Sequence, residues 1–193
     1  MENVTKNNSV LEKSRMSTRQ LVVMAMMAAI SIVLVYAIHL PLFPAASFLE
    51  YDPADIPILI VAFAYGPVSG FIMTVIVSII QGMTVSAGSG IIGIIMHIIA
   101  TGSCTLIAGS IYWKHNTRKS ALVALVVGVI VMTAAMVIMN LILTPIFMGA
   151  PREAVAAMIL PIILPFNLLK AGINCVVTFI LYKPLSNLIK KSH

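Results

Sequence analysis

The run LVVMAMMAAISIVLVYAI, residues 21–38, decides the class of this chain because it contains no charged side chain. A helix of about 20 apolar residues crosses the roughly 30 Å hydrocarbon core of a bilayer. Lys13, Arg15 and Arg19 precede the run, as basic residues precede the apolar part of a signal peptide. That part is typically about 7 to 15 residues long, so the longer run here predicts a retained first transmembrane helix.

The whole composition agrees with a membrane protein. Of 193 residues, 60% are hydrophobic and 9% are charged. A soluble core could not hide so much apolar surface, whereas helices in lipid expose it on their outer faces. The sequence therefore predicts an all-α integral membrane protein, with a polar tail over residues 1–17 and one membrane domain over residues 18–193.

The remaining apolar runs divide that domain into six predicted transmembrane helices. The second is short, and such short or proline-interrupted segments often mark the binding sites of transporters. The helices are predicted over about Thr18–His39, Ala54–Tyr65, Pro67–Val85, Ile91–Trp113, Ser120–Phe147, and from a turn at Gly149–Arg152 to about Tyr182, with Pro161 and Pro165 bending the last one.

The positive charges predict the orientation of the helices. Nearly all of the 12 Lys and Arg residues lie in the tail, in WKHNTRK (113–119) and after Tyr182. Basic residues beside membrane spans favour the cytoplasmic side, so we expect a multi-pass protein of the cell membrane with both termini in the cytoplasm. The clusters form no continuous basic stripe, which argues against nucleic acid as a partner.

The first loop, LPLFPAASFLEYDPADIP (40–57), contains four prolines and three acidic residues. Such a segment cannot form a helix that faces lipid, so we expect an irregular loop outside the bilayer.

Five polar residues within the helices are predicted to lie at similar depths. At about 1.5 Å per residue from the cytoplasmic ends, they lie roughly 20 to 31 Å into the membrane, in its outer half. Their common depth beneath an acidic and aromatic loop predicts a cavity open to the outside. The five are Gln81, His97, Asn140, Asn167 and Lys170.

Lys170 is the strongest of these signals, because an ammonium in hydrocarbon costs at least a few kcal/mol and must face protein or water. It shares a helix face with Asn167 and Asn174. It either contacts a ligand or forms a structural ion pair with Glu50 or Asp52. Gln81 and His97 either contact the ligand or hydrogen-bond a neighbouring helix.

The sequence contains no motif typical of an enzyme, a metal site or a nucleotide-binding protein. HExxH, GxSxG and a glycine-rich loop ending in GK[ST] are all missing, and the acidic residues lie in the loops. Cys104 and Cys175 lie in apolar runs without ligand spacing, so we predict no metal and no disulfide. An importer built from this chain would take its energy from an ion gradient or a partner ATPase.

Several motifs together resemble one family. They are FLEYDPADIP (48–57) followed by a short helix and Gly66-Pro67, SGIIGIIMHIIATG (89–102), Asn140 with Pro145, PFNLLK (165–170) and TFILYK (178–183). Over about Arg19–Lys191 the chain resembles the substrate-binding S components of energy-coupling factor (ECF) transporters, most closely the RibU-type riboflavin components.

The resemblance implies a six-helix S-component bundle whose outer loop caps a pocket for riboflavin, with no bound cofactor. It implies that Asn167 and Lys170 bind the polar edge of the flavin and that Phe43, Phe48 and Tyr51 supply flat contacts. Glu50, Asn140, Gln81 and His97 complete the expected site, and His97 stands where many members have an amide.

The family also implies partners: a membrane scaffold subunit, the T component, and two cytoplasmic ATPases. Ala25 and Ala29 resemble the face that docks on the scaffold, although small residues four apart also favour packing between a protein's own helices. Another vitamin as ligand remains an alternative, because specificity depends on a few side chains. A membrane enzyme and a channel-forming subunit are the other classes considered.

Overall fold

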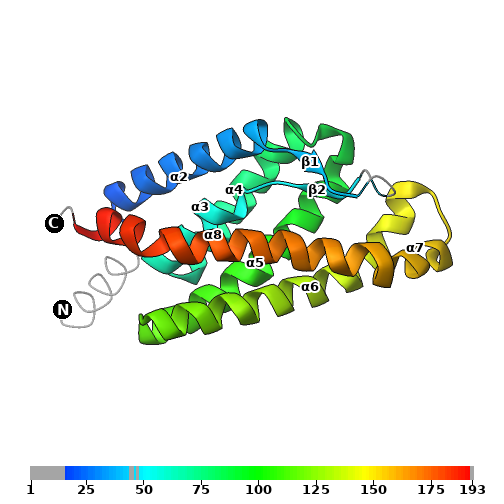
Figure 1. The fold of residues 1–193 in the computed structure, drawn as a ribbon. Coiled ribbons are helices and arrows are strands. Elements are labelled where there is room, and N and C mark those ends of the chain that lie inside the picture. The colour runs from blue at the N-terminus through cyan, green and yellow to red at the C-terminus, as the bar shows by residue number, and fades with distance from the viewer. Residues whose placement is uncertain (1–15, 44–45, 47, 192–193) are drawn as a thin grey trace, which may run out of the picture.

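The computed structural model describes residues 16–43, 46 and 48–191, which form long helices joined by short turns (Figure 1). The first helix, α2, begins after Ser17, whose hydroxyl accepts a hydrogen bond from the backbone N–H of Gln20. The helices are α2 (Thr18–Ala37), α3 (Asp55–Tyr65), α4 (Pro67–Met83), the 3-10 turn η2 (Ala87–Ser89), α5 (Gly90–His115), α6 (Arg118–Met148), α7 (Arg152–Met158), the π-helical turn η3 (Ile159–Ile163) and α8 (Leu164–Lys191).

Four helical segments of the described chain are long and apolar enough to cross a membrane, which supports a multi-pass membrane protein. They span residues 18–37, 87–115, 118–148 and 152–187. The helices α3 and α4 have 11 and 17 residues and are shorter than the roughly 20 that a full span requires. Six complete spans therefore stay a prediction.

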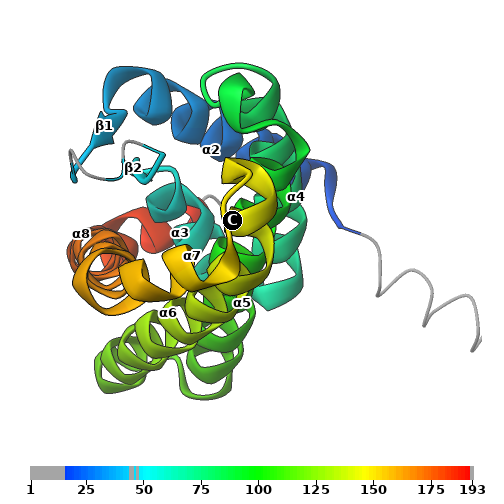
Figure 2. The ribbon, with the colours of Figure 1, turned by 90° about the vertical axis from the view of Figure 1, so that its right-hand side faces the viewer.

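The short helix α3 lies at the centre of the bundle, packed against α2, α4, α5 and α8 (Figure 2). Every residue from Asp55 to Ala64 is buried. Ile58, Val61 and Phe63 are completely inaccessible. The apolar sequence of α3 is therefore explained by burial in protein on all sides rather than by contact with lipid.

The ends of the predicted helices agree with the structure to within about two residues, except at the C-terminus. The expected break between α3 and α4 is present, because Gly66 adopts φ +95° and Pro67 starts the next helix. The predicted end at Tyr182 is wrong, since α8 continues through Pro184 to Lys191. Leu185 and Ile189 still pack against the core, and this packing maintains the helix beyond the proline.

Of the two prolines expected to bend the last helix, Pro161 lies in an irregular turn, whereas Pro165 is the second residue of α8. Pro161 lies within η3, a five-residue π-helical turn that joins α7 to α8. Because proline has no N–H to donate, the regular α-helical pattern is interrupted there.

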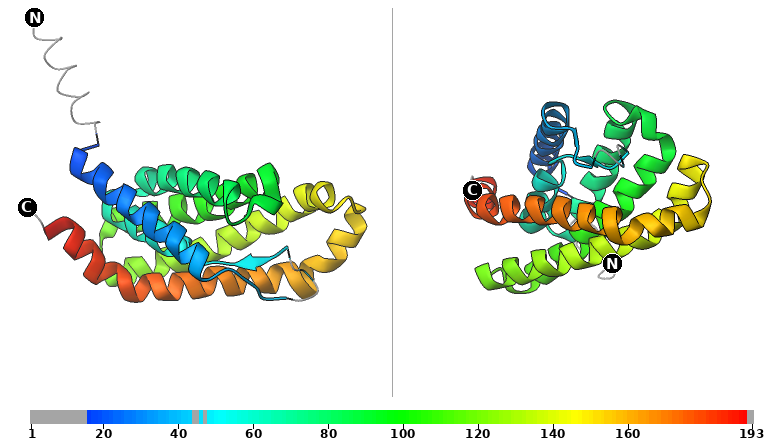
Figure 3. Two further views of the ribbon diagram at one scale, coloured as in Figure 1. Left: turned by 90° about the horizontal axis from the view of Figure 1, so that it is seen from above. Right: turned by 45° about the vertical axis from the view of Figure 1, so that its right-hand side comes forward.

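The first loop contains a small hairpin that was not predicted. Strands β1 (Leu40–Pro41) and β2 (Glu50–Tyr51) pair antiparallel, with Leu40 opposite Tyr51 and Pro41 opposite Glu50. The hairpin lies alongside α8 and far from the end of the molecule where α2 begins and α8 ends (Figures 1 and 3). At that other end, the guanidinium of Arg19 donates to the carbonyl of Ile189 at 2.8 Å. Residues 1–15 of the predicted tail lie outside the described part of the chain.

Close packing of α3, α4 and α5 depends on a glycine, which gives a testable prediction. A Cβ on Gly70 would lie 2.5 Å from Thr105 Cγ2 and 2.6 Å from Ala62 Cβ. We expect Gly70→Ala to lower the melting temperature of the detergent-purified protein by several degrees, because overpacking typically costs about 1 to 3 kcal/mol. Gly172→Ala is the control, since open space surrounds Gly172. Equal melting temperatures for the two variants would contradict this packing.

Candidate functional site

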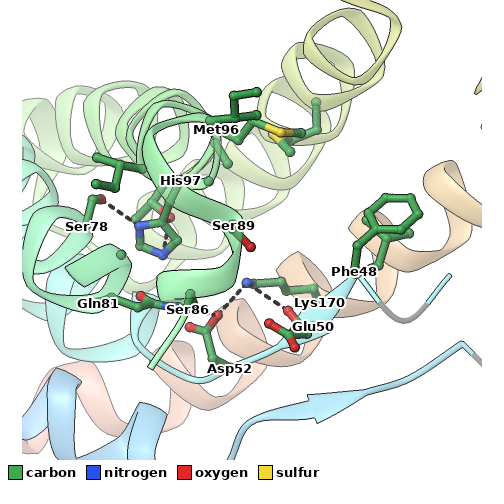
Figure 4. Close-up of a pocket in the computed structure, with 18 of the residues that line it drawn as sticks. Phe48, Glu50, Asp52, Ser78, Gln81, Ser86, Ser89, Met96, His97 and Lys170 are labelled. Atoms are coloured by element: carbon green, nitrogen blue, oxygen red, sulfur yellow. Dashed lines mark hydrogen bonds and ion pairs between the residues drawn. The ribbon is translucent and has the colours of Figure 1, made fainter. Parts of the chain in front are cut away.

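A cavity lies between the first loop and helices α4, α5, α6 and α8 (Figure 4). Six of the predicted site residues line it: Phe48, Glu50, Gln81, His97, Asn167 and Lys170. They come from four separate segments of the chain, which the fold brings together around one space.

Asn140 does not line the cavity but supports residues that do. Its side-chain N–H donates to the carbonyl of Met136, and its side-chain oxygen accepts from the hydroxyl of Thr144, both at 2.8 Å. Met136 and Thr144 line the cavity. Met96, Met132 and Met136 also lie on the cavity wall.

Two predicted aromatic contacts also lie outside the lining. The ring of Phe43 packs edge-to-face on Phe166, with ring centroids 6.3 Å apart, and Phe166 itself lines the cavity. The hydroxyl of Tyr51 donates to the side-chain oxygen of Asn174 at 3.1 Å. Direct contact of Phe43, Tyr51 and Asn140 with a ligand stays a prediction.

Lys170 forms the ion pair that the sequence offered as one alternative, and it lines the cavity as well. Its Nζ lies 2.7 Å from Asp52 Oδ2, and it also donates to the carbonyl of Glu50 at 3.4 Å. Burial by itself raises the pKa of Asp52, but the ammonium of Lys170 outweighs this effect and lowers that pKa to about 2. Asp52 is therefore a carboxylate at neutral pH.

Gln81 is tied to the same carboxylate. Its side-chain N–H donates to Asp52 Oδ2 at 3.3 Å. Its side-chain oxygen is buried and has no hydrogen-bond partner among the described residues. An unpaired buried acceptor costs free energy, so this position favours a donor that is not part of the chain.

A second buried carboxylate, that of Asp55, binds polar side chains at the base of the cavity, which we call the polar floor. Its Oδ1 accepts from the hydroxyl of Thr101 at 2.6 Å and lies 3.7 Å from His97 Nε2. Its Oδ2 accepts from the side-chain N–H of Asn174 at 2.9 Å. On the other side of the imidazole, Nδ1 lies 2.7 Å from the hydroxyl of Ser78. His97 thus has the neighbouring-helix partners that one alternative expected, and it also faces the cavity.

Several of these polar partners were not predicted from the sequence. The sequence placed the acidic residues in the loops outside the bilayer, whereas Asp52 and Asp55 are both buried, and Asp55 is the first residue of α3. Helical spacing could have found Ser78, which lies about one turn before Gln81 on α4. It could also have found Thr101, which lies one turn after His97 on α5.

The described residues contain no group of three or more His, Cys, Asp or Glu that could hold a metal ion. The walls of the cavity are mostly apolar, and a few polar groups converge on its floor. Such a cavity suits an organic molecule that is mostly apolar and carries a few polar groups.

Ala25 and Ala29 are exposed on α2, while Met24, Met27 and Ser31 on the same helix are buried. The two alanines therefore lie outside the buried core of this chain, and a docking role stays a prediction.

A family model described as "ECF transporter, substrate-specific component" matches residues 19–182. The chain belongs to this family. It is a transport component and not an enzyme, as the sequence predicted.

Curated relatives of this S component carry the name riboflavin transporter. RibU of Streptococcus thermophilus is 31% identical over 185 residues, which cover 91% of this chain and 86% of the relative. FmnP of Bacillus subtilis is 28% identical over 189 residues, which cover 92% and 99%. A solved S component of a bacterial ECF transporter superposes with a TM-score of 0.76 at 29% identity and covers 89% of this chain and 97% of its own.

Proposed function

We propose that this S component binds riboflavin in the cavity beneath the first loop and delivers it for import by an ECF transporter. The observation that carries the proposal is the combination of a buried ammonium and amides with apolar and aromatic walls in one cavity. Relatives named riboflavin transporters, about 30% identical over most of the chain, support this choice of vitamin.

The polar groups fit the edge of a flavin ring. An ammonium has three N–H donors, and Lys170 uses two of them on Asp52 and Glu50, which leaves one for a ligand oxygen. The side-chain nitrogen of Asn167 donates once, to the carbonyl of Ile163, so its second N–H and its oxygen remain for the imide edge. Phe48, Phe166 and the cavity methionines would contact the flat faces of the ring.

The proposal includes an orientation and a set of partners. The first loop lies on the outer side and caps the pocket of a six-helix bundle, and both termini lie in the cytoplasm, as the distribution of basic residues favours. A membrane scaffold subunit and two cytoplasmic ATPases supply the energy. Ala25 and Ala29 form part of the docking face, which their exposure on α2 supports.

Riboflavin binding can be tested directly with the detergent-purified protein. We expect riboflavin to bind tightly and reversibly with quenched fluorescence, because the ring passes from water to a buried site. Thiamine and pantothenate should neither bind nor displace it. A fluorescence titration without quenching up to saturating riboflavin, or tight binding of another vitamin instead, would reject riboflavin as the ligand.

The two polar residues on α8 should each contribute to affinity. We expect Lys170→Ala and Asn167→Ala to weaken riboflavin binding by about 1 to 3 kcal/mol, the usual cost of a buried polar group left unpaired. Leu169→Ala on the same helix is the control, because Leu169 is 46% exposed and faces outward. Unchanged affinity with a lowered melting temperature would mean that Lys170 serves only the ion pair with Asp52.

The docking face can be separated from the binding site. We expect Ala25→Leu combined with Ala29→Leu to leave riboflavin affinity near wild type while abolishing co-purification with the scaffold subunit and uptake in cells. Bulky side chains would hold the partner helix away and lose its close packing. Val33→Leu is the control, on an exposed position of the same helix. Loss of riboflavin binding in the double variant would reject the docking assignment.

A further inference from the structure

Asn174 lies one helical turn after Lys170 on α8, and it does not line the cavity. It is 1% exposed, and its side-chain hydrogen bonds go to residues 51–55, at the end of the first loop and the start of α3. Its N–H groups donate to the carbonyl of Asp52 at 3.1 Å and to Asp55 Oδ2 at 2.9 Å. Its oxygen accepts from the hydroxyl of Tyr51 at 3.1 Å. Both donors and the acceptor of this amide are therefore in use.

Within the segment Tyr51–Asp55, residues 52–54 link strand β2 to helix α3 and form neither helix nor strand. The hairpin before it has only two residues in each strand, and a sheet of that size is marginally stable alone. Beyond the hairpin, Asp52 accepts from the N–H of its own neighbour Ala54 at 3.1 Å, which shapes the segment but does not attach it to the bundle. Side chains attach the segment to the surrounding helices, and Asn174 makes three of these hydrogen bonds, more than any other side chain. The others come from Lys170 and Gln81 to Asp52, from Thr101 to Asp55 and from Ser31 to the carbonyl of Ala54.

The same segment forms part of the wall of the cavity through Asp52, and Glu50, which lies just before the segment, lines the cavity as well. We propose that Asn174 is a positioning residue that clamps Tyr51–Asp55 to α8 and so sets how long a bound ligand stays in the cavity. This proposal rests on the proposed function, since it takes riboflavin as the ligand.

The clamp should act on release more than on capture. In this proposal a ligand beneath the first loop leaves when residues 51–54 move off α8 while Asp55 stays in α3, and that movement breaks the hydrogen bonds of Asn174 with the Tyr51 hydroxyl and the Asp52 carbonyl. Affinity differences between variants of one site also appear mostly in the dissociation rate. The groups facing the ligand are unchanged in an Asn174 variant, so the absorption spectrum of bound riboflavin should stay the same.

The experiment compares Asn174→Leu and Asn174→Asp with wild type by stopped-flow fluorescence. Leucine removes all three bonds, whereas aspartate keeps an acceptor for Tyr51 but loses both donors and adds a charge beside Asp55. We expect the dissociation rate of riboflavin to rise roughly tenfold or more in both, corresponding to at least about 1.4 kcal/mol, with a much smaller change in the association rate. Tyr51→Phe removes one bond and should show a smaller increase.

Thr178→Val is the matched control. Thr178 is buried one turn further along α8, and its hydroxyl donates only to the backbone carbonyl of Asn174, within the helix. It should leave both rates near wild type. Hydrogen exchange without ligand adds an independent measurement, in which the backbone amides of residues 49–52 and 54 should exchange faster in Asn174→Leu but not in Thr178→Val.

The outcomes separate the two proposals. If wild type does not bind riboflavin, the proposed function fails, and the exchange measurement still tests the clamp. If wild type binds but the Asn174 variants release riboflavin at the wild-type rate, the clamp is rejected. A lowered melting temperature with unchanged rates and unchanged exchange would give Asn174 a purely structural role.

Discussion

The ion pair between Lys170 and Asp52 is the interaction on which the binding site depends. An ammonium inside an apolar bundle must meet a counter-charge or water, and here it meets a carboxylate 2.7 Å away. That carboxylate comes from the first loop, so neutralising the charge of α8 also draws the loop into the bundle. The pair is therefore both a structural bond and part of a cavity wall.

Around this pair the polar groups form two connected layers. Asp52 accepts from Lys170 and Gln81 beside the cavity, and Asp55 accepts from Thr101 and Asn174 beneath it. Each carboxylate is nearly inaccessible and has several donors, as buried charges require. The consequence is a polar floor whose geometry is fixed before any ligand arrives, and preorganisation of this kind reduces the entropy that binding costs.

The central position of α3 explains how a short chain builds such a floor. A helix of 11 residues cannot span a bilayer by itself, but it can lie among longer helices that shield it from lipid. Its N-terminal residue, Asp55, then stands within the bundle where α5 and α8 can reach it. The loop before α3 also lies within contact distance of the surrounding helices, and segments distant in sequence therefore share one cavity.

The sequence by itself determined the class, the approximate ends of most helices and six of the residues that line the cavity. These follow from local properties: apolar length, glycine and proline at helix ends, and the high cost of a polar group in lipid, which makes Gln81, His97, Asn167 and Lys170 conspicuous. Only the tertiary structure decided the partners of those residues. How the proline-rich loop packs against α8 decides the burial of Asp52 and Asp55 and the hydrogen bonds of Asn174. The position of Asn140 behind the cavity wall is likewise a result of packing. No periodic pattern in a sequence encodes a contact between residues more than 100 positions apart. Prediction from the sequence has the same limit for α3, because an apolar run has the same sequence pattern whether lipid or protein surrounds the helix.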